Sequence, residues 1–266
     1  MSATHDVRDA YTQTARAWSE GPERVFAAMA DALVARSPIA VDGATAVDLG
    51  TGSGVVARAL TRGGAHVTVL DDAGPMLALA RTHAAGRAAM ADVCALPLRA
   101  RSVDLVCAGF VLNHLTDPRA ALSGMARSVR AGGGLLASTW ARGDEHPVKH
   151  AVEAALVRRG WTRPAWYARL KETTTPLTDT AELLGAAADR AGLADVDARA
   201  IRVDLDDVPV DAMIAWRTNL PPNAPFVAAL DDDDRRALVA EVTDALGPDV
   251  PPLRLQMVAL SSRVAA

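Results

Sequence analysis

Residues Ala44 to Leu60 read ATAVDLGTGSGVVARAL, and this stretch decides the fold. An apolar run with β-branched residues comes first, a glycine-rich turn follows it, and an Ala/Leu/Arg segment suited to a helix comes last. That order predicts a strand, a tight loop and a helix start, the opening of a nucleotide-binding βαβ unit. Glycine at Gly50, Gly52 and Gly54 lets the loop backbone approach a ligand that a Cβ would hold away. The chain is therefore expected to bind a molecule that contains a nucleoside.

The spacing of these glycines argues against a dinucleotide. The dinucleotide fingerprint G-x-G-x-x-G/A needs a small residue at position 55, which is Val55, and the third glycine comes one place early. The pattern is instead G-x-G-x-G preceded by Asp48. A lone glycine-rich turn is weak evidence, so the strands that follow must agree with it.

The second predicted strand, His66–Leu70, ends at two acidic residues, Asp71 and Asp72. An acidic side chain about 20 residues beyond the loop can accept hydrogen bonds from both ribose hydroxyls. Ala73–Leu77 then reads AGPML, which is similar to the end of the motif D-x-S-x-x-M-L with Ala73 in the serine position. The change removes one expected helix cap and leaves the ribose contact in place.

Three further motifs follow in order. Ala91–Pro97 is similar to G-D-A-x-x-L-P, and Ser102–Leu115 is similar to F-D-x-V-x-x-x-x-x-L-H-H-L. Met125–Gly134 is similar to M-x-R-V-L-K-P-G-G, with Ala131 in place of the proline. Together the five motifs resemble those of class I S-adenosylmethionine-dependent methyltransferases, in particular the ubiquinone/menaquinone type.

The resemblance implies an α/β, Rossmann-like fold: a mainly parallel seven-stranded sheet whose last strand is antiparallel, at the sheet edge, plus a helical cap. It also implies S-adenosyl-L-methionine as cofactor, S-adenosyl-L-homocysteine as its product, and a small-molecule acceptor. In the family, the aspartate at the position of Asp92 receives the adenine amino group. The residues expected at the cofactor are Asp48, Gly50, Thr51, Gly52, Gly54, Asp71, Asp72, Met76, Asp92, Val93, Ala108, Gly109 and Trp18.

Length, composition and charge set further limits. The 266 residues, half of them apolar, suffice for one large core or for a core plus a cap. A net charge of −4 argues against a nucleic-acid partner, because phosphate binding needs a basic face. Cys94 and Cys107 fall in or beside predicted buried strands, so we expect reduced core residues. With no run of ~18 apolar residues and no apolar signal region, the protein is expected to be cytoplasmic, without membrane contact, and a monomer or homodimer.

We expect one methyltransferase domain over residues 1–266. Residues 1–40 precede the first strand and are expected to form a helical lid, and 44–141 to form the cofactor-binding core. Beyond residue 141 the alternation of strands and helices breaks. The later segments are expected as cap or insertions over the carboxyl ends of the strands (143–177 and 208–250) and as the rest of the sheet (178–205 and 251–266).

Several local patterns in the second half of the chain make specific predictions. Trp161–Tyr167 is too rich in proline and aromatic residues for a core element, and Thr173–Pro176 reads as a loop. Thr178 and Asp179 are expected to cap a helix that runs to Arg190. The acidic run Asp231–Asp234 precedes a helical segment, so we interpret it as a helix start and not as a metal site.

The candidate acceptor-binding residues are aromatic or polar: Tyr11, Asn113, Trp140, His150, Trp166 and Trp216. Tyr11 and Trp18 are seven residues apart and share a helix face, which fits either packing on the body or a lid over the cofactor. The tryptophans of 143–177 fit either an apolar acceptor pocket or plain packing.

The candidate bases are His114, after the fourth strand, and His146, in the insertion. His114 is interpreted either as a base or as a residue that shapes the pocket. The function we expect is methyl transfer to a small, apolar or aromatic molecule, quinone-like or a natural-product intermediate. The alternatives are an S-adenosylmethionine-binding protein that catalyses a step such as cyclisation, and a non-catalytic partner that keeps the fold.

Overall fold

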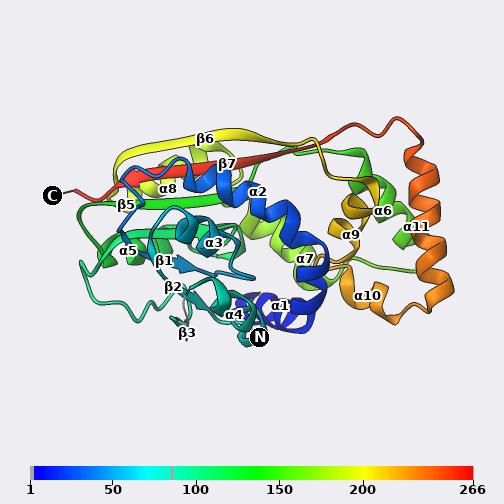
Figure 1. The fold of residues 1–266 in the computed structure, drawn as a ribbon, viewed down its shortest axis with the longest axis horizontal. Coiled ribbons are helices and arrows are strands. Elements are labelled where there is room, and N and C mark those ends of the chain that lie inside the picture. Colours follow the sequence, from blue (N-terminus) through cyan, green and yellow to red (C-terminus); the bar gives the residue numbers. More distant parts are fainter. Residues whose placement is uncertain (1–2, 85–86, 266) are drawn as a thin grey trace.

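The computed structural model describes residues 3–84 and 87–265, and its centre is a seven-stranded sheet in the order β3-β2-β1-β4-β5-β7-β6 (Figure 1). The strands are β1 (Thr45–Leu49), β2 (His66–Asp71), β3 (Ala88–Met90), β4 (Val103–Gly109), β5 (Val129–Trp140), β6 (Ala194–Leu205) and β7 (Leu253–Arg263). The first five strands pair in parallel, which confirms the mainly parallel α/β sheet. The strand order reverses between β1 and β4, so ligands are expected at the carboxyl ends of these two strands.

The position of the last strand corrects the sequence-based expectation. β7 pairs antiparallel with both β5 and β6, so it lies inside the sheet and β6 forms the edge. The burial pattern fits this place, because Leu255, Val258 and Leu260 of β7 are fully buried whereas most residues of β6 are exposed or half-buried. The antiparallel direction of the last strand and its position in the sequence were predicted correctly, and its place at the edge was wrong.

Helices cover both faces of the sheet. On one face lie α2 (Pro22–Val34), α3 (Val55–Arg62) and α4 (Gly74–Ala80), and on the other lie α5 (Pro118–Ser128) and α8 (Ala181–Arg190). Alternate strand residues supply the two cores: Ala46 of β1 packs in the first and Val47 in the second. The amino-terminal helix α1 (Ala3–Glu20) packs against α4 and α2.

Beyond one end of the sheet, four helices gather on the right of Figure 1. They are α6 (Pro147–Arg158), α9 (Val210–Thr218), α10 (Ala224–Ala229) and α11 (Asp232–Leu246). The short helix α7 (Ala165–Arg169) lies between this group and the sheet. Residues 173–176, which were expected to form a loop, belong to a π turn and a 3₁₀ turn over residues 170–177. The cap of α8 is Thr180, whose side chain accepts from the Leu183 amide, and not Thr178 or Asp179 as predicted.

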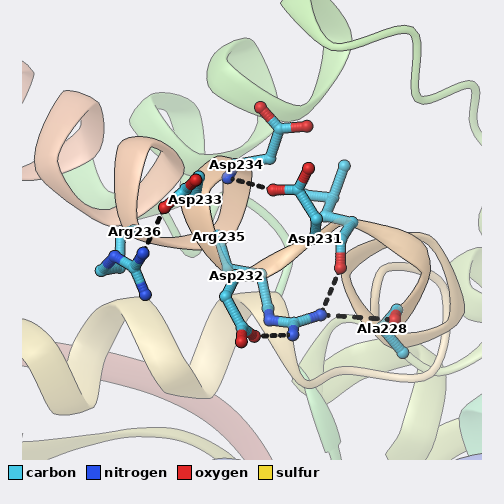
Figure 2. Close-up of polar contacts among 8 residues, drawn as sticks. Ala228, Asp231, Asp232, Asp233, Asp234, Arg235 and Arg236 are labelled. Atoms are coloured by element: carbon cyan, nitrogen blue, oxygen red, sulfur yellow. Dashed lines mark hydrogen bonds and ion pairs between the residues drawn. The ribbon is translucent and has the colours of Figure 1, made fainter.

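The acidic run Asp231–Asp234 begins α11, as the sequence predicted (Figure 2). Asp231 is the N-cap and accepts from the Asp234 amide at 2.7 Å. Asp232 and Asp233 pair with Arg235 and Arg236, each three residues further along the helix. Carboxylates at this end also interact favourably with the helix dipole, which accounts for the run without any metal.

A membrane-crossing helix is not found within the described ranges, because none is both long and apolar enough.

Gly21 joins α1 to α2 and lies against the backbone of α9. A Cβ at Gly21 would lie 2.7 Å from the carbonyl carbon of Ala215. We therefore expect Gly21→Ala to lower the free energy of unfolding by about 1–3 kcal/mol, the usual cost of overpacking.

Urea unfolding measures this change. The control is Gly124→Ala in α5, where the nearest atom to the new Cβ is Leu96 Cδ1 at 3.9 Å and alanine favours the helix. Equal effects of the two substitutions would show that Gly21 does not hold α2 against α9.

Candidate active site

A cavity of about 550 Å³ opens at the carboxyl ends of β1, β2, β4 and β5. Its volume lies within the usual range of small-molecule sites. Eleven residues predicted at the cofactor line it: Asp48, Gly50, Thr51, Gly52, Asp71, Asp72, Met76, Asp92, Val93, Gly109 and Trp18. All six acceptor candidates and His114 also line it: Tyr11, Asn113, Trp140, His150, Trp166 and Trp216.

Three predicted site residues do not line the cavity. Gly54 packs α3 against α4, since a Cβ there would lie 2.9 Å from Ala80 Cα. Ala108 is buried among core residues on the α5 and α8 side of the sheet. His146 begins α6, where its Nδ1 accepts from the Val148 amide at 3.3 Å and its Nε2 lies 3.2 Å from the Pro251 carbonyl oxygen. Both ring nitrogens contact backbone groups, so His146 is withdrawn as a candidate base.

The glycine loop leaves room for a ligand directly in front of it. Gly52 has a φ of +55°, and no heavy atom lies within 4 Å of the point where its Cβ would stand. The Asp71 carboxylate braces the loop, because it accepts from the Gly52 amide and from the Ala73 amide, both at 2.8 Å. Each carboxylate oxygen keeps a further lone pair, so Asp71 can still accept from ribose hydroxyls.

Asp48 has one carboxylate oxygen with a partner and one without. Its Oδ2 accepts from the Thr51 hydroxyl at 2.5 Å and from the Ala57 amide at 3.0 Å. Its Oδ1 is buried and has no hydrogen-bond partner among the described residues. Burial raises the pKa of Asp48 to about 7. An orphaned acceptor on the cavity wall is complementary to a cation, and S-adenosylmethionine carries an ammonium and a sulfonium, so the site fits the expected cofactor.

Asp72 and Asp92 form the outer, more exposed rim of the cofactor half. Burial, followed by the charge of Asp92, raises the pKa of the half-buried Asp72. Asp92 accepts from the Cys94 amide at 2.8 Å, and Cys94 is exposed, not a core residue as predicted. The strand before it, β3, has only three residues, so this segment reaches the surface beyond the sheet. Cys107 is buried in β4, as predicted.

The amino-terminal helix places a row of aromatic rings over the cavity. The ring centroids of Tyr11 and Trp18 lie 5.4 Å apart, so the two residues share a helix face, and Trp18 Nε1 donates to Ser53 Oγ at 3.2 Å. Trp18 in turn lies 4.7 Å from Phe26, centroid to centroid. This row ties α1 to the glycine loop, and its action as a lid remains a prediction.

His114 lies in a short helical turn after β4, between α1 and the cavity. Its Nε2 is 3.5 Å from the Tyr11 hydroxyl and 3.4 Å from Asn113 Nδ2. Its Nδ1 and the Asn113 Oδ1 are buried without a partner in the described part of the chain. Burial, and then the charge of Lys171, lowers the pKa of His114 to about 4, so the ring is neutral at physiological pH.

Phe110 is a cavity residue that sequence reasoning missed. It follows β4 with a φ of +58°, a left-handed conformation that is uncommon for an aromatic residue. Its ring lies 4.8 Å from Trp140 and 5.1 Å from Phe26, centroid to centroid. Strained backbone of this kind persists where the surroundings enforce it, commonly at functional sites. A phenylalanine in a motif gives no sign of its φ, so the sequence carried no signal.

The far half of the cavity is aromatic and charged. Trp161 is buried, and its Nε1 donates to the Pro222 carbonyl oxygen at 3.1 Å, so the proline-rich segment 161–167 does supply a packed core residue, contrary to expectation. Three acid–base contacts line this half: Lys149 with Asp144 at 2.5 Å, His150 with Glu145 at 2.6 Å, and Arg163 with Glu153 at 2.6 Å. Arg217 also lines it. Of these residues, the sequence reasoning singled out only His150.

No group of three or more His, Cys, Asp or Glu side chains is placed to hold a metal ion within residues 3–84 and 87–265.

The comparisons with known proteins agree with this geometry. Residues 47–137 match a family model described as a methyltransferase domain. The demethylmenaquinone methyltransferase of Clavibacter sepedonicus is 30% identical over 212 residues, which cover 75% of this chain and 84% of that protein. The ubiquinone biosynthesis O-methyltransferase of Xanthomonas campestris pv. campestris (strain B100) is 30% identical over 143 residues, 49% of this chain. The chain matches only 59% of the length of that relative.

A solved structure with the same fold shows why fold alone does not settle the reaction. The 4+2 cyclase SpnF superposes with a TM-score of 0.53 at 16% identity, over 90% of this chain and 80% of that chain. At such low identity the likeness concerns the fold only.

The pH dependence of stability tests the environment of Asp48. Its pKa is about 7 in the folded state and about 3.9 for an aspartate in an unfolded chain, so between about pH 4 and about pH 7 the folded state binds more protons. The free energy of unfolding therefore falls as pH rises through this window, by up to about 1.4 kcal/mol per pH unit. Asp48→Asn removes the titration, so its stability relative to wild type should rise from about pH 5 to about pH 8.

Urea unfolding of both proteins across this range provides the measurement. Asp249→Asn replaces an exposed carboxylate and serves as the control, with a curve parallel to that of wild type. If Asp48→Asn also ran parallel to wild type, the buried oxygen would not carry the titration.

Proposed function

The chain belongs to the class I S-adenosylmethionine-dependent methyltransferase family, and from that premise we propose that it methylates a small apolar or aromatic molecule, quinone-like or a natural-product intermediate. The observation that supports the proposal is the continuity of the cavity. One wall is the glycine loop with Asp48 and Asp71, and the other carries Trp140, Trp166 and other aromatic side chains. A nucleoside cofactor and a flat acceptor can therefore lie in one enclosure.

S-adenosylmethionine supplies an electrophilic methyl group, which passes to a nucleophilic atom of the acceptor and leaves S-adenosylhomocysteine, while the acceptor's proton, where it has one, goes to a base or to water. The residues of this chain position the two reactants and exclude water from them. The aromatic row from α1 covers the loop, and Phe110 and Trp140 close the side of the cavity. Holding two reactants in line supplies much of the rate in such a displacement.

His114 lines the cavity beside Tyr11 and Asn113, and we infer that it contacts the acceptor. Its neutral ring can accept or donate one hydrogen bond, and its low pKa makes it a weak base. Asn113, whose side-chain oxygen also lacks a partner in the described chain, can share this contact. We infer that the two side chains orient the acceptor, with proton removal by His114 as the competing role.

A labelled-methyl assay tests the proposed reaction. The protein is incubated with methyl-labelled S-adenosylmethionine and a panel of hydroquinones, phenols and aromatic amines, and products are read by mass spectrometry. We expect label in at least one aromatic acceptor, S-adenosylhomocysteine in equal amount, and no binding of NAD by calorimetry. Gly52→Val, which blocks backbone approach to the cofactor, is the inactive control.

Two results would contradict the proposal. A product of unchanged mass, formed only when the cofactor is bound, would favour the cyclase alternative. Cofactor binding without any turnover across the panel would favour a non-catalytic partner.

The His114→Ala variant separates orientation from base catalysis. An orienting role predicts a kcat reduced by less than about 100-fold, a raised KM, and a pH profile of kcat between about pH 6 and about pH 9 with the wild-type shape, because His114 titrates near 4. Steady-state kinetics with the labelled acceptor gives all three quantities.

A fall of about 10²–10⁴-fold in kcat at unchanged KM would instead assign the base to His114. His150→Ala is the matched control, since His150 lines the same cavity but is exposed and contacts Glu145. Loss of the pH dependence in that variant alone would place the base in the insertion.

A further inference from the structure

Arg217, on α9, lines the acceptor half of the cavity without a carboxylate partner. The Arg217 guanidinium makes no ion pair and no hydrogen bond with any described residue, and its Nε is buried; the one side-chain hydrogen bond at this residue comes from Asn223 Nδ2 to the Arg217 backbone carbonyl, at 2.8 Å. Guanidinium N–H groups are donors only, so their missing partner is a hydrogen-bond acceptor. A buried donor without a partner is costly, which makes an unmatched arginine in a cavity a sign of a ligand.

The other cations of the cavity differ from Arg217. Arg8 pairs with Asp9, Lys149 with Asp144 and Arg163 with Glu153, within the described chain. Lys171 lines the cavity without an ion pair there, but it is exposed and can stay hydrated. Arg217 is thus the cavity cation that combines a buried guanidinium nitrogen with the lack of a partner.

The neighbours of Arg217 fix its orientation but do not satisfy it. Its guanidinium carbon lies 5.2 Å from the centroid of the Trp216 ring, a cation–π contact. Trp216 Nε1 is itself a buried donor with no partner in the described residues. Two adjacent residues on the cavity wall therefore offer unmatched donors, and an acceptor oxygen of a ligand would satisfy them.

Burial lowers the pKa of the Arg217 guanidinium, and the charge of Tyr167, followed by those of three carboxylates, partly offsets this effect. The three carboxylates are Glu153, Asp144 and Glu145. Each of them already contacts another basic side chain: Arg163, Lys149 and His150 respectively. They surround Arg217 with negative charge at a distance. A singly charged carboxylate would meet less repulsion here than a doubly charged phosphate.

From these contacts we propose that the acceptor is an aromatic carboxylate whose carboxyl group binds the Arg217 guanidinium while its ring lies among Trp140, Trp166 and Trp216. The planar fork of arginine matches both oxygens of a carboxylate, which fixes the ring relative to the glycine loop. This inference rests on the proposed methyl transfer to an aromatic molecule and narrows its substrate class.

Calorimetry with protein loaded with S-adenosylhomocysteine tests the proposal without turnover. The probes are benzoate, salicylate, 4-hydroxybenzoate and 2-naphthoate, each beside its amide, with phenyl phosphate as the dianionic comparison. We expect at least one acid to bind roughly 10-fold to 100-fold more tightly than its amide and than phenyl phosphate. Arg217→Gln should remove that preference, and Arg217→Lys should restore part of it.

The control variant is Arg158→Gln on α6, which removes the same charge outside the cavity lining and should keep the preference. S-adenosylhomocysteine affinity checks that each variant is folded, and the acid-to-amide ratio of the wild type stands even if Arg217→Gln does not fold. Equal binding of acids and amides, tighter binding of phenyl phosphate, no binding of any acid, or an Arg217→Gln protein that keeps the preference would each overturn the inference. Failure of the proposed function is distinct: it appears as absent methyl transfer in the labelled assay.

Discussion

The active site depends on two buried carboxylates that hold the loop between β1 and α3. Asp48 binds the Thr51 hydroxyl and the Ala57 amide, and Asp71 binds the Gly52 amide from the next strand. Backbone amides in a glycine loop can be oriented only if something accepts their hydrogen bonds. Placing the two acids here is unfavourable: burial raises the pKa of Asp48 to about 7 and that of Asp71 to about 6, and the charge of Asp71 adds to the effect on Asp48. The loop is therefore held in place before any ligand binds, and the unfavourable burial of two carboxylates is needed to hold it.

The sequence predicted the parts of the site that lie on one short segment or at the end of a strand. Asp48, Gly52 and Asp71 follow from the glycine spacing and from the parallel order of β1 and β2, because parallel strands bring their carboxyl ends to one edge. Motif resemblance added Asp92 and Val93 in the same way. Each of these positions is set by local chain geometry, which the sequence encodes directly.

Other features depend on contacts between distant segments, and no pattern announced them. In the sequence nothing distinguishes Arg217 from the other arginines. What distinguishes it is the packing of α9 beside α6, which brings it near acids that already pair with other basic side chains. The positive φ of Phe110 accompanies the packing of its ring against Phe26 and Trp140, which are distant from it in the sequence. His146 shows the opposite error: a histidine in the right insertion proved to be a helix cap, because the direction of a side chain is fixed by the helix it begins. The place of β7 between β5 and β6 was missed for a similar reason, since the order of strands in a sheet is decided by pairing and not by sequence order.

The two halves of the cavity differ in charge, and this difference affects where each of two ligands can bind. The cofactor half presents Asp48, Asp71, Asp72 and Asp92, and burial makes the first two costly when ionised and unpaired. The acceptor half presents the unmatched guanidinium of Arg217. A cationic cofactor therefore removes an unfavourable interaction at one end, and an anionic acceptor removes one at the other. Under the proposed function, one cavity holds a cationic cofactor and an anionic acceptor. The two ligands attract each other, so binding of either one favours binding of the other. Under the proposed function, an anionic acceptor in the cofactor half would face four acidic side chains, which supports the order of the two molecules that we propose along the cavity.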